Sequence, residues 1–380
     1  MKKTLLVNYV YYPPIGHAIE ALRYTLGYHK ADSNYEISLV LSKHTPYFLA
    51  DLCPWIKKTY TVDLPWDTKA SEVSQDLMSH IPQSWDYVVS DARSKTTEYC
   101  PESYFTYYKL ADQYFAVWIE KGFCGDKTIP YKPNCQLRFK LPEKNLSFAK
   151  KKIIDTKVKI GIMFAGADYA EHNPSIESWQ EMVDVLYKQY PDLSIYLFGR
   201  IERSDRGTVT AGITKGDVES FLKRYPKSVN CFDMGLLNQL AIAKHCDVFV
   251  SPHTGFAFAV LSVGTPWLTI SGTHWAEYFY NGVPFYSVLP DCGKYPCYGR
   301  MLKECLENTK QGKRVLCMTR DRLRKGLPEI LKGAEILINK KWDYETCLKG
   351  HFEKLIKHQG ASGRIYAFDS IHEQFIKREG

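Results

Sequence analysis

The sequence predicts an α/β protein in which two Rossmann-like, doubly wound domains face each other across a cleft. Three observations lead to this prediction. The chain has 380 residues, which is enough for two or three domains. Its 45% hydrophobic and 24% charged residues are typical of a globular protein and argue against disorder, collagen-like repeats and coiled coils. Strand-like and helix-like runs alternate in two series, a pattern typical of parallel sheets with helices on both faces.

The first series predicts an N-terminal domain over residues 1–150. A β-branched and aromatic run at residues 4–12 predicts a strand that ends at Pro13 and Pro14 and leads through Gly16 and His17 into a helix. The other expected elements of this domain are strands at 36–41, 58–62 and 87–90, and a helix at 47–52. The last of these strands ends at Asp91, on the sheet edge where open parallel sheets bind ligands.

The second series predicts a C-terminal domain over residues 151–340. A polar, lysine-rich stretch at 142–155 is interpreted as the linker between the two domains. The expected strands are 157–164, 194–198, 247–251 and 267–271, and the expected helices are 175–190, 236–244 and 256–263. Residues 341–380 are interpreted as basic helices that pack back toward the N-terminal domain, after apolar periodicity at 322–338 and 345–357.

The charge of the chain is unevenly distributed. The net charge is +8, yet residues 1–293 carry 31 basic and 31 acidic side chains, whereas residues 294–380 carry 19 and 11. The lysines of the tail are spread over amphipathic helices without clustered aromatic residues, which argues against nucleic-acid binding. Solvated helix faces are the ordinary interpretation, and contact with anionic inner-leaflet lipid or an acidic acceptor is the alternative.

No uncharged apolar stretch is long enough for a membrane helix. The first residues imitate a secretion signal, but Asn8, the two prolines at 13 and 14 and the missing cleavage site argue against one. We therefore expect a cytoplasmic protein, with peripheral membrane contact as the alternative.

Residues 247–272 carry the strongest functional signal. A buried strand ends at Ser251 and delivers His253, Thr254 and Gly255 to a helix that starts near Phe256. Backbone N–H groups and the positive end of the helix dipole would face a ligand there, and a diphosphate fits such a place. The same pattern also fits a plain strand–loop–helix crossover in which Gly255 only permits a tight turn.

Two residues are candidates for proton transfer. His17 is the first choice for a general base, because an imidazole takes up a proton near neutral pH; capping or packing on the first helix is the alternative. Asp91 would orient His17 and stabilise the imidazolium, or act as the base itself, and a helix N-cap is the structural interpretation. Glu20 is interpreted as a first-turn partner of the helix dipole.

Three further residues are candidates for donor binding. Arg200 follows a strand and carries a guanidinium suited to phosphate oxygens, with Arg203 and Arg206 as alternatives in the same role and surface placement as the structural interpretation. Gly166 and Ala167 follow the first strand of the second domain and would let the backbone approach the leaving phosphate or the transferred sugar.

Residues 229–272 resemble the C-terminal signature of the family-9 glycosyltransferases, the bacterial lipopolysaccharide heptosyltransferases. The matching segments are Leu240 to Lys244, Asp247 to Ser251, Thr254-Gly255, Ala257 to Val263, Gly264-Thr265-Pro266 and Gly272. The family usually has Asp at the position of His253 and Pro-Met-His at 256–258. The resemblance implies the GT-B arrangement, with the nucleotide-sugar held by the C-terminal domain and the acceptor by the N-terminal one.

The loop before the first helix resembles a different group of enzymes. Pro14, Gly16 and His17 form a Pro-x-Gly-His loop that is similar to macrolide- and flavonoid-type glycosyltransferases, in which the histidine deprotonates the acceptor hydroxyl. In family 9 an acidic residue usually follows the glycine. The departures at His17 and His253 indicate that the sugar need not be a heptose.

Four cysteines lie at 292, 297, 305 and 317. The run Tyr295-Pro296-Cys297-Tyr298, followed by Cys305 and Cys317-Met318, resembles a cysteine-rich segment found in many heptosyltransferases. The spacing of the four cysteines does not match a zinc ribbon. Reduced core cysteines or a disulfide are the favoured interpretation. Autotransporter heptosyltransferases resemble this family and carry a four-cysteine iron site, so a structural metal, iron or zinc, held by Cys292, Cys297, Cys305 and Cys317 is the alternative. Catalysis itself is expected to require no cofactor.

The sequence therefore predicts a metal-independent, inverting glycosyltransferase that uses a nucleotide-diphosphate sugar and an acceptor hydroxyl. The alternatives are a two-domain nucleotide-sugar 2-epimerase and a non-catalytic nucleotide-sugar-binding protein.

Overall fold

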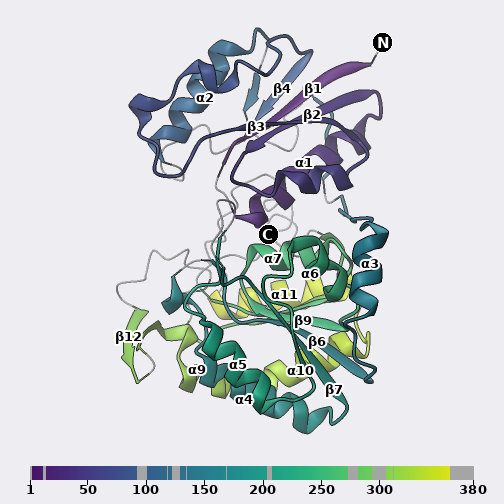
Figure 1. Ribbon diagram of the computed structural model, residues 1–380, viewed down its shortest axis with the longest axis vertical. Coiled ribbons are helices and arrows are strands. Elements are labelled where there is room, and N and C mark those ends of the chain that lie inside the picture. Colours follow the sequence, from purple (N-terminus) through teal and green to yellow (C-terminus); the bar gives the residue numbers. More distant parts are fainter. Residues whose placement is uncertain are drawn as a thin grey trace. The chain divides into compact units, whose positions relative to one another are not determined.

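The structure is a computed structural model of the chain (Figure 1). It describes residues 2–11, 14–91, 101–117, 119–121, 129–133, 135–167, 169–202, 208–272, 281–292, 295, 305–310 and 312–359. These residues form two compact units, one that extends to Phe139 and one that begins at Lys140. Each unit is built around its own parallel sheet.

The first unit has a five-stranded parallel sheet with the strand order β3-β2-β1-β4-β5. Its strands are β1 (Lys3–Tyr9), β2 (Tyr35–Ser42), β3 (Ile56–Val62), β4 (Tyr87–Ser90) and β5 (Ile119–Lys121). β1 is the central strand, and its last five residues are buried. Strands that are covered on both faces read as continuous apolar runs, which is why the sequence shows β1 so clearly.

Helices cover both faces of this sheet. They are α1 (Ile15–Ala31) and α2 (Glu102–Tyr114), with short 3₁₀ helices η1 (Tyr47–Leu52), η2 (Ala70–Glu72) and η3 (Gln75–Met78). α1 connects β1 to β2 on one side of β1, and α2 follows β4 on the other side, so right-handed crossovers place the two helices on opposite faces (Figure 1).

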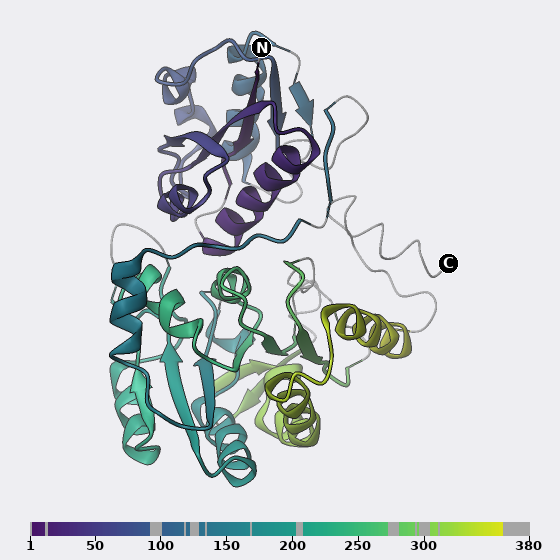
Figure 2. The same cartoon turned by 90° about the vertical axis from the view of Figure 1, so that its right-hand side faces the viewer.

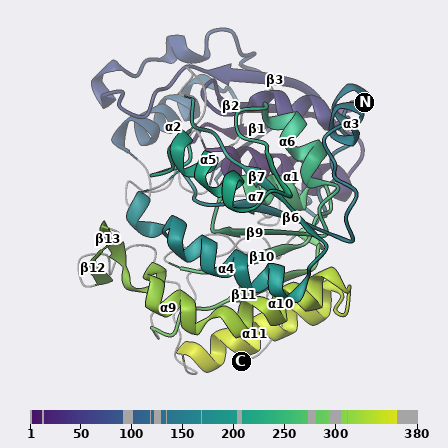
Figure 3. The ribbon, with the colours of Figure 1, turned by 60° about the horizontal axis from the view of Figure 1, so that its bottom comes forward.

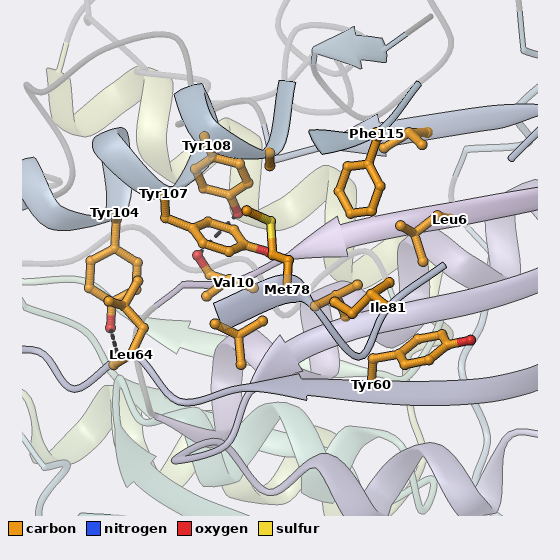
Figure 4. Packing of buried hydrophobic residues seen from close by; sticks show 14 of the residues in the cluster. Leu6, Val10, Tyr60, Leu64, Met78, Ile81, Tyr104, Tyr107, Tyr108 and Phe115 are labelled. Carbon is orange, nitrogen blue, oxygen red and sulfur yellow. Dashed lines mark hydrogen bonds between the residues drawn. The ribbon is translucent and has the colours of Figure 1, made fainter. Parts of the chain in front are cut away.

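Tyrosines of α2 form much of the core beneath that helix (Figure 4). Buried tyrosine rings contribute large apolar area, but their hydroxyls require partners. The Tyr107 hydroxyl donates to Oδ1 of Asn8 at 2.9 Å, and the Tyr108 hydroxyl donates to the carbonyl of Val10 at 3.1 Å. Asn8 is in β1 and Val10 just follows it, so α2 fixes the carboxyl end of the central strand.

The second unit has a six-stranded parallel sheet with the order β11-β10-β9-β6-β7-β8. Its strands are β6 (Val158–Met163), β7 (Leu193–Phe198), β8 (Ser228–Asn230), β9 (Val248–Pro252), β10 (Trp267–Ile270) and β11 (Phe285–Val288). A separate antiparallel hairpin consists of β12 (Leu306–Thr309) and β13 (Gly312–Val315).

Helices lie on both sides of the second sheet (Figure 2). They are α3 (Glu143–Lys150), α4 (Ile176–Gln189), α5 (Lys215–Arg224), α6 (Leu236–Ala243), α7 (Gly255–Leu261), α9 (Arg320–Lys325), α10 (Leu327–Ile338) and α11 (Tyr344–Gln359), with 3₁₀ helices η5 (Ala170–His172) and η7 (Leu316–Met318). α10 packs against α4 and covers β10 and β11 (Figure 3). Ser175 and Thr214 cap α4 and α5 by accepting hydrogen bonds from backbone N–H groups.

The segment interpreted as a linker is instead part of the second unit, so that interpretation is wrong. α3 packs on α6, where Nδ2 of Asn145 donates to Oδ1 of Asn238 at 2.7 Å, and Ala149 is fully buried. The three lysines at 150–152 are exposed at the end of this helix. Their charge made the segment look unstructured, whereas residues 145 and 149, four apart, share the packed face. The two compact units divide at 139/140.

The packing of residues 341–380 toward the N-terminal domain stays a prediction. The described part of the tail, up to residue 359, belongs to the second unit. α11 packs on β11, where the ring of His351 meets Phe285 edge-on at 5.5 Å and Nζ of Lys354 donates to the carbonyl of Ser287 at 3.2 Å. Residues 360–380 lie outside the described residues. Among the helices that are described, none has the length and apolar content needed to cross a membrane.

Candidate functional site

The strand order identifies a binding position on each sheet. Both sheets have the Rossmann order, in which the second and third strands lie on one side of the first strand and the later strands lie on the other. The order therefore reverses between β1 and β4 in the first unit and between β6 and β9 in the second. Ligands of open α/β sheets bind beyond the carboxyl ends of the strands at such reversals. The predicted catalytic residues follow β1 and β4, and most predicted donor-binding residues follow β6 and β9.

His17 lies in the first turn of α1, just beyond β1. Its Nδ1 is 3.3 Å from Oε2 of Glu20, and the two side chains are 27% and 22% exposed. The same carboxylate accepts hydrogen bonds from the hydroxyls of Tyr9 and, at 3.3 Å, Tyr24. A carboxylate at Nδ1 favours the tautomer that carries a proton there, which makes Nε2 the nitrogen that accepts a proton.

The sequence had assigned Glu20 to the helix dipole, and the structure corrects this. The first turn of α1 contains no acidic residue, because Glu20 lies one turn further on. Through its contact with His17 at i,i+3 spacing, Glu20 is a carboxylate partner of the imidazole. The sequence analysis had proposed Asp91 for that position. The side chain of Asp91 is 1% exposed, and its backbone N–H donates to the carbonyl of Asn8 at 3.2 Å. Asp91 directly follows β4, the strand that pairs with β1. Its pairing with His17 stays a prediction. Gly16 is buried in the first turn of α1.

Two loops meet at the reversal point of the second sheet. A Cβ atom added to Gly166, after β6, would lie 3.3 Å from the carbonyl oxygen of His253 and 3.7 Å from Cγ2 of Thr254, after β9. The first of these distances is shorter than most Cβ contacts, so a glycine at 166 allows the two loops to pack this closely. Ala167, next in the chain, is exposed.

Hydrogen bonds with residues outside the reversal point hold the loop that contains Gly166. Oδ1 of Asn173 accepts a hydrogen bond from the backbone N–H of Gly166 at 3.1 Å. Nη1 of Arg314, in β13, donates to the carbonyls of Ala170 at 2.6 Å and of Asn173 at 3.0 Å. Burial lowers the pKa of the Arg314 guanidinium, yet arginine remains protonated at neutral pH. The β12–β13 hairpin therefore supports the shape of this loop.

Thr254 begins α7. Its Oγ1 accepts a hydrogen bond from the backbone N–H of Ala257 at 3.2 Å, and its own backbone is extended, as is usual at an N-cap. The first N–H groups of a helix have no partner inside the helix. Those of Gly255 and Phe256 are in this position, next to the Gly166 loop.

Two of the predicted donor-binding side chains have structural roles. Ser251 is fully buried, and its Oγ accepts from Nε1 of Trp267 at 3.0 Å and donates to the carbonyl of the following residue at 2.8 Å. The ring of Phe256 is buried and lies 5.6 Å from that of Phe198 in β7. The buried side chains of Ser251 and Phe256 thus anchor the loop after β9 to the core of the second unit. His253 meets the ring of Phe258 edge-on, with centroids 5.5 Å apart.

Arg200 follows β7, the neighbour of β6. Its backbone N–H donates to Oγ1 of Thr210 at 3.0 Å, and its carbonyl accepts from the backbone N–H of Thr210 at 2.7 Å. Its Nε donates to the carbonyl of Glu202 at 3.0 Å. Arg203 and Arg206, the alternatives for the same role, lie outside the described residues.

Three of the four clustered cysteines are described. Cys292, Cys305 and Cys317 are of intermediate exposure, and Cys297 lies outside the described residues. A Cβ atom on Gly272 would lie 3.0 Å from Sγ of Cys317, so these two positions are close neighbours. Among the residues that the structure describes, no three His, Cys, Asp or Glu side chains are grouped so as to hold a metal ion.

Two solved structures share this architecture. A family 9 glycosyl transferase from Veillonella parvula DSM 2008 matches 90% of this chain and 99% of its own length, with a TM-score of 0.59 and 13% identity. The ADP-heptose LPS heptosyltransferase II of E. coli matches 87% of this chain and 99% of its own length, with a TM-score of 0.52 and 11% identity. The chain has the fold of these glycosyltransferases. No protein-family model and no curated protein matches it.

The expected pair of doubly wound α/β domains is therefore confirmed, and the resemblance to family-9 glycosyltransferases holds at the level of the fold. The sequence did not indicate the supports of the two loops. Arg314 lies in a hairpin far along the chain and has no local signal. Glu20 had a local signal, because it lies three residues after His17 and residues three apart on a helix lie on the same face.

Proposed function

We propose that the protein is an inverting glycosyltransferase that moves a sugar from a nucleoside-diphosphate donor to an acceptor hydroxyl. The observation that carries the proposal is the convergence of Gly166 with His253 and Thr254 at the reversal point of the second sheet. It is supported by a fold shared with a family 9 glycosyl transferase over 90% of the chain.

The second unit would hold the donor. The diphosphate would accept hydrogen bonds from the backbone N–H groups of Gly255 and Phe256, and the side chains of His253 and Arg200 would add donors. Thr254, although it caps α7 as an acceptor, keeps its hydroxyl proton for the ligand. These groups oppose the negative charge that builds up on the leaving diphosphate, so the proposed step uses no metal ion.

The first unit would activate the acceptor. Nε2 of His17 takes the proton of the acceptor hydroxyl while its oxygen bonds to the anomeric carbon. The bond from that carbon to the diphosphate oxygen breaks, and the leaving group keeps the electron pair. Glu20 stabilises the imidazolium at Nδ1, and Asp91 is the second carboxylate proposed to assist. A single displacement inverts the anomeric carbon.

Nucleotide binding is the first test. The thermal midpoint of the whole chain is measured with ADP, UDP, GDP, CDP and dTDP, because a ligand at 100 times its Kd stabilises the native state by about 2.7 kcal/mol. We expect one or two of these nucleotides to raise the midpoint clearly. A chain that responds to none of the five would contradict the donor site.

Turnover then distinguishes this proposal from the alternatives. A transferase releases nucleoside diphosphate quickly only when an acceptor is present, and His17→Ala abolishes that stimulation while nucleotide affinity is kept. A two-domain 2-epimerase converts the nucleotide-sugar without an acceptor. A non-catalytic binding protein binds the nucleotide-sugar and changes it in neither condition.

A further inference from the structure

A row of aromatic rings leads from His17 to the surface of the first unit. Tyr11, just after β1, meets His17 edge-on with ring centroids 4.8 Å apart and an interplanar angle of 86°. The Tyr11 ring lies 6.1 Å from that of Tyr104, and Tyr104 lies 5.7 Å from Trp66. Tyr104 is fully buried, whereas Trp66 is 43% exposed. The row thus connects the proposed base to an exposed indole.

The sheet places both ends of this row on one edge. Trp66 lies in the segment after β3, and Tyr11 and His17 follow β1. β1, β2 and β3 are parallel neighbours, so all three strands end at the same edge. An acceptor whose hydroxyl lies at His17 would extend along this edge.

The core holds the Trp66 segment in place. The hydroxyl of Tyr104 donates to the carbonyl of Leu64 at 3.2 Å, two residues before Trp66 (Figure 4). The next turn is closed by the backbone N–H of Thr68, which donates to the carbonyl of Pro65 at 3.2 Å. Single exposed aromatic residues are common on protein surfaces. Trp66 differs because its ring packs on a core tyrosine and continues a row that begins at the proposed base.

Polar side chains accompany the indole on the same edge. Asp63 directly follows β3, and its carboxylate contacts Nζ of Lys43 and Nε2 of His44, both at 2.9 Å and both just after β2. The hydrogen bond from Lys43, with a further one from His44, lowers the pKa of Asp63. The carboxylate is therefore ionised and matched by a cation, and about half of it is exposed. The cluster offers donors and acceptors to a neutral ligand.

We propose that Trp66 is the stacking platform of an acceptor subsite for a neutral sugar ring, an inference that rests on the proposed glycosyl transfer. A pyranose presents C–H groups on its face and hydroxyls around its rim. The negative face of an indole attracts the C–H groups, and polar groups at the edge pair with the hydroxyls. The Lys43–His44–Asp63 cluster supplies those polar groups, which a purely apolar acceptor would leave unpaired. The acceptor is thus a saccharide that reaches from Trp66 to His17.

Acceptor kinetics test the inference. Release of nucleoside diphosphate from the donor identified by thermal shift is measured with methyl glucopyranoside, methyl galactopyranoside and lactose. Sorbitol and 1-propanol serve as hydroxyl compounds without a ring. Trp66→Ala should raise the KM for the best saccharide about tenfold, which corresponds to about 1.4 kcal/mol, and leave kcat and nucleotide affinity unchanged. Trp66→Phe should retain most of the affinity, because it keeps an aromatic face.

Phe48→Ala is the matched control, since Phe48 is 39% exposed in the same unit and is not one of the four rings of the row. An unchanged KM in Trp66→Ala would overturn the proposal. A fall in kcat together with a fall in the thermal midpoint of Trp66→Ala would also overturn it, because that result would assign Trp66 a role in stability. Equal stimulation of nucleotide release by sorbitol and by the saccharides would overturn it as well.

A direct binding experiment separates this inference from the proposed function. Binding of lactose and the two methyl glycosides to the whole chain is followed by saturation-transfer NMR, with no donor present. Saccharide signals that Trp66→Ala removes and Phe48→Ala keeps support the subsite even in a chain that shows no transfer. Signals that persist in Trp66→Ala overturn the subsite and leave the proposed transfer standing.

Discussion

Glu20→Gln removes one charge from the neighbourhood of His17 and leaves the size of the side chain unchanged. Nδ1 of His17 and Oε2 of Glu20 are 3.3 Å apart, and the two side chains are 27% and 22% exposed. Coulomb's law gives about 4 kcal/mol for unit charges at about 4 Å in a dielectric of about 20. Solvent screens a pair that is this exposed, so we expect the carboxylate to stabilise the imidazolium by about 1–2 kcal/mol. Transfer should then slow about 5- to 30-fold.

The rate is measured as acceptor-stimulated release of nucleoside diphosphate, together with nucleotide affinity and the thermal midpoint. Glutamine still accepts a hydrogen bond from one of the two tyrosines, so the change in unfolding free energy should stay below about 1 kcal/mol. Glu219→Gln is the matched control, because Glu219 is 65% exposed on α5 and pairs only loosely, at 3.9 Å, with Lys215. An unchanged rate in Glu20→Gln, or a loss no larger than that of Glu219→Gln, would refute the role of Glu20 at His17.

Three further predictions concern the second unit. Gly166→Ala places a Cβ atom 3.3 Å from the carbonyl of His253, so the loops must separate slightly, and calorimetric titration should show nucleotide affinity reduced about tenfold. Arg314→Gln loses the charge-assisted hydrogen bonds to two loop carbonyls, and urea unfolding should show a loss of about 2 kcal/mol. Burial, with a smaller contribution from Lys354, lowers the pKa of His351 to about 3. Between about pH 6.5 and 3 the His351 imidazole is therefore protonated in the unfolded chain and neutral in the folded one, so stability falls as the pH falls through that window. His351→Phe should lose less stability over the same window.

Each of these variants has a matched control. Gly216→Ala adds a Cβ atom no closer than 3.8 Å to its nearest neighbour, so nucleotide affinity should not change. Lys313→Gln alters the exposed residue beside Arg314 and should leave urea unfolding within about 0.5 kcal/mol of the parent. His80→Phe replaces an exposed histidine and should keep the acid loss of stability intact. Acid unfolding that is identical in His351→Phe and the parent chain would show that His351 does not contribute to it.

The parts of the fold that the sequence predicted correctly are those with a strong local pattern. β4 begins and ends at the predicted residues, and β1, β2, β6 and β7 lie within a few residues of their predicted bounds. Each is a buried central or near-central strand, so its apolar run is set by burial on both faces. Those strand ends also located the loops of the candidate site, because the site residues directly follow them.

Elements with weak local patterns escaped prediction. β5 and β8 contain three residues each and exist as strands through pairing with β4 and β7. α2, rich in tyrosines, has no simple apolar stripe in the sequence, and its burial depends on hydroxyl partners in β1 and the segment after it. α3 was mistaken for a linker because its exposed lysines dominate the local sequence, whereas few of its residues contact α6.

The sequence by itself determined the α/β class, the two-sheet organisation and the residue types at the carboxyl edges of the strands, because hydrophobic periodicity and loop chemistry are local properties. Only the tertiary structure decided which of those residues touch. It paired His17 with Glu20, packed Gly166 against the loop of His253, and extended a row of rings to Trp66. Such contacts depend on strand order and on the side chains that fill the space between elements. Residues distant in sequence become neighbours only when the sheets form.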